Sequence, residues 1–186
     1  MAAVLLAGAA TPAAAQANPA DVAFMQGMIA HHAQAVTMSA MIPSHTTRRE
    51  MQLLGERITV SQTDEIRLMQ HWLERHGVDA PGVETHEGHG GLAMVADSLM
   101  PGMLTLDEMK RLAAARGDEF DRLFLQGMIR HHGGALTMVA RLFASQGAAQ
   151  DPEIFGFASD VEADQRAEIA RMQSLLDKLS AGTRRP

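Results

Sequence analysis

Apolar residues recur every three to four positions along most of the chain, and this period predicts amphipathic helices. One such pattern starts at Pro19 and continues until Pro43 ends or kinks it, and a second covers about residues 46–76. A third begins near Asp118, and a fourth opens at Pro152. No segment shows the alternation of apolar and polar residues that is typical of a strand. The sequence therefore predicts an all-α protein with four long helices, arranged as a four-helix bundle.

Local signals mark where these helices begin and end. Asn18 followed by Pro19 is typical of a helix start, and Gly77 is a stop signal for the second helix. Residues 78–104 are rich in Gly and Pro and are expected to be mostly loop. The pattern Thr105-Leu-Asp-Glu108 fits a capping box for a short helix, which Gly117 should end.

The two halves of the chain repeat the same pattern. Residues 21–38 match residues 121–138, with identical Asp, Phe, Gln-Gly-Met-Ile, His-His, Ala and Thr-Met positions. A weaker match follows, in which a Gln-x-x-Glu-Ile-x-x-Met segment starts at Gln62 and again at Gln165. Such a duplication predicts two similar helical hairpins, over about 20–77 and 118–180, related by approximate two-fold symmetry.

Each repeat places histidine and methionine on the same helix surface. At about 100° per residue, His32 shares a face with Met25 and Met28, as His132 does with Leu125 and Met128. His31 lies one step around the first helix beside Met38, and His131 lies beside Met138. Adjacent side chains diverge on a helix, so we expect one histidine of each pair to face inward and the other to lie at a seam.

Composition limits the kinds of function to be considered. The chain has 186 residues, of which 46% are hydrophobic, enough for one domain over residues 18–186. A net charge of −6 without a basic patch argues against nucleic-acid binding. The absence of cysteine excludes disulfides, Cys-ligated zinc, iron–sulfur clusters and thiol catalysis. By contrast, the chain has 14 Met and 9 His residues.

These donors have two interpretations, packing or metal binding. A single buried Met is usually core filler, and a single inward His is usually a hydrogen-bonded core residue. Four imidazoles at equivalent positions, each near a thioether, favour metal binding because imidazole needs polar partners when buried. Thioether sulfur and imidazole together suit Cu(I) best. Glu65 and Glu168 either accept the free N–H of a ligating histidine or are solvated carboxylates.

The central loop carries a further group of donors. These are His86, His89, Met94, Met100 and Met103. They form either a capture site or lid, or ordinary solvent-exposed side chains.

The amino terminus resembles an export signal. Residues 1–17 are uncharged, apolar and rich in alanine, and they contain small-x-small sites suited to cleavage. We interpret them as a signal peptide, with a disordered alanine-rich tail as the alternative. No segment is long and apolar enough to span a bilayer. The expected location of the mature protein is therefore periplasmic or secreted.

The doubled histidine motif resembles a known family. The residues from Phe24 to Met38, the run Met-Pro-Gly-Met-Leu at 100–104 and the residues from Phe120 to Ala135 are similar to the DUF305 family, which includes periplasmic copper-binding proteins of the CopM type. The resemblance covers about residues 20–178 and implies a ferritin-like four-helix bundle that is exported and binds copper, and also silver, in copper tolerance. The family motif falls on Met25, Met28, His31, His32, Met38, Met128, His131, His132 and Met138. Leu125 departs from the pattern and leaves the second half with one thioether fewer.

Taken together, the sequence predicts a protein that sequesters Cu(I) or hands it to a partner protein. Met28, Met128, His32 and His132 are expected to be the inner ligands, with the remaining motif residues beside them. We expect no enzyme, since the chain shows no nucleophile–base set and no phosphate loop. The alternatives are a metal-dependent redox enzyme in the same bundle, or a structural module in which the histidines pack or respond to pH.

Overall fold

The structure, a computed structural model, describes residues 17–82 and 99–182. Over this part of the chain its only regular secondary structure is helical, as predicted. Four helices are long and two are short. They are α1 (Pro19–Ala40), α2 (Ile42–His45), α3 (Arg49–Arg75), α4 (Leu106–Ala114), α5 (Gly117–Ala144) and α6 (Pro152–Gly182). The predicted signal peptide falls almost wholly outside the described residues, as do His86, His89 and Met94 of the central loop.

The helix ends follow the sequence signals. The Asn18 side chain accepts a hydrogen bond from the Ala20 amide at 2.8 Å, which caps α1. Thr105 and Glu108 form the expected capping box at the start of α4. Gly77 has a φ of +66°, a backbone conformation that glycine adopts without strain, and it lies just after the end of α3.

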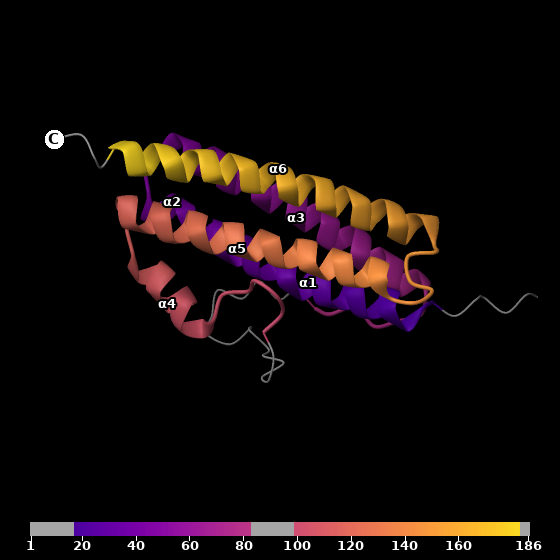
Figure 1. Cartoon of the computed structure of the whole chain (residues 1–186). Coiled ribbons are helices and arrows are strands. Elements are labelled where there is room, and N and C mark those ends of the chain that lie inside the picture. The colour runs from indigo at the N-terminus through magenta and orange to yellow at the C-terminus, as the bar shows by residue number, and fades with distance from the viewer. Residues whose placement is uncertain (1–16, 83–98, 183–186) are drawn as a thin grey trace, which may run out of the picture.

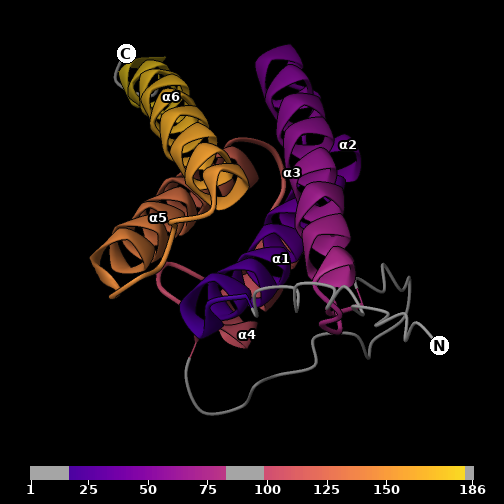
Figure 2. The same ribbon diagram turned by 90° about the vertical axis from the view of Figure 1, so that its right-hand side faces the viewer.

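The long helices form two layers (Figure 1). The helices α3 and α6 lie on one side of the molecule, and α1 and α5 lie beneath them. Within each hairpin the partners are packed together, α1 with α3 and α5 with α6, and the hairpins meet where α1 contacts α5. Viewed along the bundle, α3 and α6 diverge, while α4 covers the opposite side of the α1–α5 layer (Figure 2). None of the described helices is long and apolar enough to cross a membrane.

The buried apolar residues form two clusters, one toward each end of the bundle. Along α1, Met28 and Ile29 belong to the first cluster, whereas Ala35 and Met38 belong to the second. Along α5 the order is reversed, since Met128 belongs to the second cluster and Ala135 to the first. The histidine pairs therefore lie between the clusters. We call this region the polar layer, and it comprises His31, His32, Gln62, Glu65, His131, His132, Gln165 and Glu168.

Each hairpin is also held to the turn of the other by an aspartate. Asp21, at the start of α1, accepts a hydrogen bond from the Ala149 amide in the turn between α5 and α6, at 2.8 Å. Asp121, in the first turn and a half of α5, accepts one from Arg48 Nε in the turn before α3, at 2.7 Å. Both aspartates are buried. Two equivalent residues of the repeat thus join the hairpins at opposite ends.

Candidate metal centre

All four repeated histidines are fully buried. The rings of His31 and His131 face each other where α1 meets α5, with centroids 3.8 Å apart. His32 lies 6.4 Å from His31, and His132 lies 6.1 Å from His131, measured between ring centroids. We expected one histidine of each pair to face inward and the other to lie at a seam. The two histidines of a pair do face different neighbours, but neither is exposed. Both members of a pair are buried, because one faces its own hairpin partner and the other faces the second hairpin.

Carboxylates on α3 and α6 hold the outer two rings. His32 Nε2 lies 2.5 Å from Glu65 Oε2, and His132 Nε2 lies 2.5 Å from Glu168 Oε2. The side chain of Glu65 is 12% exposed and that of Glu168 is 6% exposed. Of the two interpretations that the sequence left open for these glutamates, the structure thus supports pairing with histidine. The contact is the same in both hairpins.

A short segment crosses the α1–α5 seam beside His31, and we call residues 100–105 the strap. His31 Nε2 donates to the Pro101 carbonyl at 2.9 Å. The buried side chain of Gln34 forms two hydrogen bonds to the Leu104 backbone, donating to its carbonyl and accepting from its amide. A Cβ atom on Gly134 would lie 1.8 Å from the Pro101 oxygen, so glycine is required there for the strap to approach α5.

Hydrogen bonding determines which ring nitrogens remain available to a metal. A carbonyl oxygen can only accept, so His31 Nε2 must carry the proton of the neutral ring. Burial, and then the neighbouring His32, lowers the pKa of His31 to about 3, so the ring is neutral near pH 7. Burial also lowers the pKa of His131 well below its usual value, with His31 and His132 adding to the effect. Neutral imidazole is the form that binds metals.

The remaining nitrogens are buried without hydrogen-bond partners. They are Nδ1 of His31, His32, His131 and His132, together with Nε2 of His131. Buried polar atoms nearly always have a partner, so a group of unpaired ring nitrogens calls for an explanation. Metal-ligating histidines typically donate their second ring N–H to a carboxylate or carbonyl, as His31, His32 and His132 are placed to do here. These three rings therefore have the hydrogen-bonding pattern of metal-ligating histidines, with Nδ1 as the free donor atom.

The predicted methionines lie on both sides of the polar layer. Met25 and Met28 are buried in the first apolar cluster, and Met38 and Met128 in the second. Met28 and Met128 each lie one helical turn before His32 and His132, so these side chains are neighbours on one helix face. Met138 differs, because it is half-buried and its Cε lies beside Gly27 together with the sulfur of Met100 from the strap.

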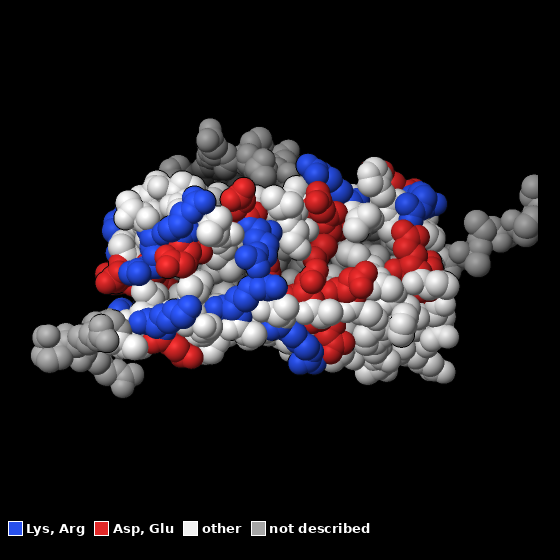
Figure 3. All heavy atoms as spheres, turned by 90° about the horizontal axis from the view of Figure 1, so that it is seen from above, with Lys and Arg blue, Asp and Glu red and all other residues white. Residues whose placement is uncertain are grey.

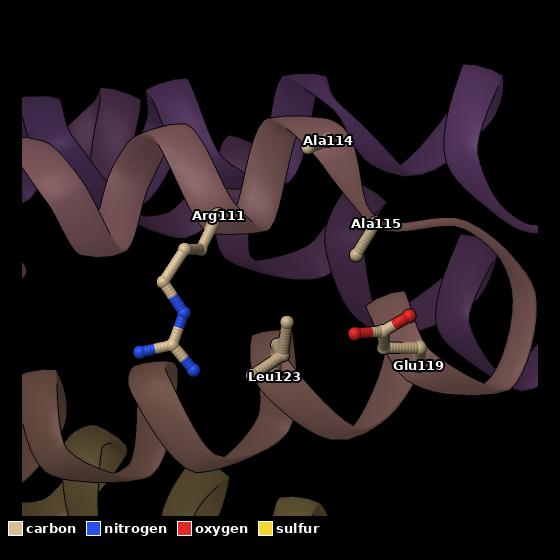
Figure 4. A pocket seen from close by; sticks show the side chains of 5 residues that line it. All are labelled: Arg111, Ala114, Ala115, Glu119 and Leu123. Atoms are coloured by element: carbon tan, nitrogen blue, oxygen red, sulfur yellow. The ribbon is translucent and has the colours of Figure 1, made fainter.

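The histidine and carboxylate side chains do not by themselves form a complete metal site. Among the residues that the structure describes, no three His, Asp or Glu side chains are grouped so that they could hold a metal ion. Metal binding here would therefore need the thioethers or a movement of the rings. A cavity of about 270 Å³ between α4 and α5 offers no alternative, because Arg111, Ala114, Ala115, Glu119 and Leu123 line it and none is a soft ligand (Figure 4).

The sequence did not identify several residues in and beside the polar layer. Gln62 is buried with both side-chain amide atoms unpaired, and its counterpart Gln165 is buried with Oε1 unpaired. Both are visible in the sequence as the first residue of the repeated Gln-x-x-Glu pattern, which was the available signal. Gln34 gave no comparable signal, and Pro101 was visible only as part of the family motif at 100–104. Their contacts could not be predicted, because they join segments about 70 residues apart.

Comparison with known proteins agrees with this architecture. Residues 21–176 match the domain of unknown function DUF305. A DUF305 fragment from Deinococcus radiodurans is 28% identical, with a TM-score of 0.71, over 87% of this chain and 98% of that one. A DUF305 protein from Streptomyces coelicolor is 26% identical, with a TM-score of 0.73, over 90% of this chain and 96% of that one.

The similar structures also include a protein solved with bound metal. CopM in its Cu(I)-bound form is 25% identical, with a TM-score of 0.64, over 85% of this chain and 96% of that one. CopM was also solved in Cu(II)-bound and Ag-bound forms. The comparison with curated protein sequences gives no match. With a family match that spans most of its length and a fold shared with solved members, the chain belongs to the DUF305 family.

Proposed function

We propose that this protein binds Cu(I) in the polar layer and either sequesters the ion or hands it to a partner protein. His32, His132, Met28 and Met128 are the inner ligands of this proposal. The rings of His31 and His131, with Met25, Met38 and Met138, lie beside them. Silver, which resembles Cu(I) in its preference for soft ligands, is a second expected cargo.

One observation carries the proposal, the set of buried imidazole nitrogens that have no protein partner. In both hairpins, a glutamate holds Nε2 of a histidine and leaves Nδ1 free. A carboxylate that accepts the N–H of an imidazole fixes the orientation of the ring and makes its other nitrogen a stronger donor. Each of these rings has a thioether one helical turn away on the same helix face, which places a soft ligand beside it.

The chemistry of these ligands favours binding and transfer rather than catalysis. Thioethers and neutral imidazoles are ligands that a soft monovalent ion prefers. The carboxylates of Glu65 and Glu168, which contact two of the rings, supply negative charge beside such an ion. The similarity to CopM, solved with Cu(I), Cu(II) and silver, supports copper as the cargo. We further propose that residues 1–17 direct export, and that the protein contributes to copper tolerance in the periplasm or outside the cell.

Removing the two inner histidines tests the proposal. The double substitution His32→Ala and His132→Ala should abolish tight Cu(I) binding in a competition titration against a Cu(I) chelator. Far-UV circular dichroism should show that the helical content is largely kept, because these rings are not needed for helix formation. The control is His71→Ala, since His71 is 69% exposed and lies outside the polar layer. Unchanged Cu(I) affinity in the double variant would refute the proposal.

A further inference from the structure

A groove runs between α3 and α6, the two long helices that diverge in Figure 2. It encloses about 310 Å³ and is lined by Ser61, Asp64, Glu65, Leu68, Phe157, Asp160, Val161 and Asp164. Half of these residues are carboxylates, contributed by both helices. Figure 3 looks onto this side of the molecule and shows Asp and Glu side chains over its middle and right-hand parts, with Lys and Arg side chains beside them.

The negative charge of the groove is only partly balanced. Arg67 pairs with Asp64 at 2.9 Å, on a largely exposed site. Within the described part of the chain, Asp160 and Asp164 form no ion pair or hydrogen bond. Burial raises the pKa of Asp164, and the negative charges of Glu65, Glu168 and Asp160 raise it further. The positive charge of Arg171 lowers this pKa and offsets part of the rise. These carboxylates therefore repel one another, and a cation between them would be stabilised.

The internal repeat shows that the fold does not require this acidity. The repeated Gln-x-x-Glu segments pair Gln62 with Gln165, an offset of 103 residues. At the same offset, the counterparts of Asp160 and Asp164 are Arg57 and Ser61. The counterpart of Asp64 is Ala167. Only Glu65, whose counterpart is Glu168, has an acidic equivalent. The acidity of the other three groove carboxylates is therefore not imposed by the repeated fold.

The groove is connected to the polar layer through Glu65. Its Oε1 accepts a hydrogen bond from Ser61 at 3.2 Å, and its Oε2 contacts His32 Nε2 at 2.5 Å. His32 itself is fully buried, and its Nδ1 has no partner. One carboxylate thus lines the groove and also touches the first buried imidazole.

Two buried glutamines of the polar layer have side-chain atoms without hydrogen-bond partners. Gln62 lies one helical turn before Glu65, and Gln165 lies one turn after Val161, so each shares a helix face with a residue that lines the groove. Both glutamines are at least 98% buried, yet their side-chain oxygens have no partner. A water molecule or a passing cation would satisfy these oxygens, which protein atoms leave unpaired.

We propose that the α3–α6 groove is the route by which a metal cation reaches the polar layer. Asp160 and Asp164 attract the ion, and Glu65 connects the groove to His32. This inference rests on the proposed metal binding and adds the path to it. Because carboxylates are hard ligands, they do not retain a soft ion, and their effect is on the rate of association.

The test neutralises the groove without changing the predicted ligands. The full chain carrying Asp160→Asn and Asp164→Asn is mixed rapidly with silver nitrate in nitrate buffer. The reaction is stopped with excess chelator after set times, and the retained silver is measured by mass spectrometry. At low ionic strength we expect association at least about 10-fold slower than in the wild type, and a weaker dependence of the rate on salt. The final amount of silver bound per chain should be unchanged.

A control with the same loss of charge separates the groove from net charge. Asp107→Asn with Asp177→Asn removes two exposed carboxylates outside the groove and should leave the rate near that of the wild type. Equal rates in the groove variant and the wild type, or equal slowing in the control, would overturn the inference while leaving metal binding intact. A wild type that retains no silver would overturn the proposed function and this inference with it.

Discussion

At the residue scale, the two hairpins differ at one thioether of the repeated motif. Met25 faces the first apolar cluster, whereas the equivalent position of the second hairpin is Leu125, and both are buried. Leucine therefore fills this position without disturbing the fold. Met28 and Met128, by contrast, keep sulfur at both equivalent positions.

This difference predicts unequal effects of removing sulfur. Met28→Leu should weaken Cu(I) binding at least about 10-fold, because it removes a soft inner ligand. Met25→Leu should weaken it less. Both substitutions conserve volume, so each should change the free energy of unfolding by less than about 1.5 kcal/mol. Chelator competition and urea unfolding measure the two quantities, and equal Cu(I) affinities in the two variants would contradict the assignment of Met28 as an inner ligand.

The sequence identified the histidines and glutamates of the site, but it did not show which of their atoms are hydrogen-bonded. The repeat identified His32, His132, Glu65 and Glu168, because the same spacing occurs twice. It could not show that His31 donates to Pro101, since a backbone carbonyl has no residue-type signal. Which nitrogen is free depends on that contact, so the donor atoms became known only from the structure.

At the scale of elements, the strap depends on close contact with α5. Gly102 has a φ of +79°, and a Cβ there would lie 2.4 Å from the Arg130 carbonyl oxygen. Gly134 faces the strap at similarly short range. The sequence predicted the caps of α1 and α4, because caps are local, but it described residues 78–104 mostly as loop. The position of the strap is set by its contacts with α1 and α5, whose residues are far away in the sequence.

Adjacent glycines of α5 test the seating of the strap. Gly134→Ala should destabilise the protein by about 1–3 kcal/mol, because the new Cβ would overlap the Pro101 carbonyl. Gly133→Ala meets no atom within 4 Å and should instead stabilise α5, by up to about 1 kcal/mol. Thermal or urea unfolding gives both values. The contact would be disproved by similar stabilities in the two variants.

At the scale of the whole molecule, the hairpins are joined by their α1–α5 contact and by the two buried aspartates. The repeat predicted two similar hairpins, because a duplicated pattern folds into duplicated units. It did not predict the roles of Asp21 and Asp121, which resemble ordinary acidic residues in the first turns of helices. Their partners, Ala149 and Arg48, belong to the turns of the opposite hairpin.

Arg48 allows one of these contacts to be measured against a matched neighbour. It bonds both to Asp121, whose side chain is 1% exposed, and to Asp118, which is 73% exposed. Asp121→Asn should lower the free energy of unfolding by about 1–3 kcal/mol, since the buried acceptor of the Arg48 hydrogen bond loses its negative charge. Asp118→Asn should cost less than about 1 kcal/mol, because exposed ion pairs contribute little. A larger loss in the Asp118 variant would show that the buried contact does not hold the hairpins.

The central claim is that imidazole nitrogen from the polar layer and methionine sulfur from the positions beside it bind the same Cu(I) ion. X-ray absorption spectroscopy of the Cu(I)-loaded protein tests it most directly, because it counts the neighbours of the metal by element. We predict a first shell that contains both sulfur and imidazole nitrogen. A shell without sulfur, or one made of oxygen alone, would contradict the claim.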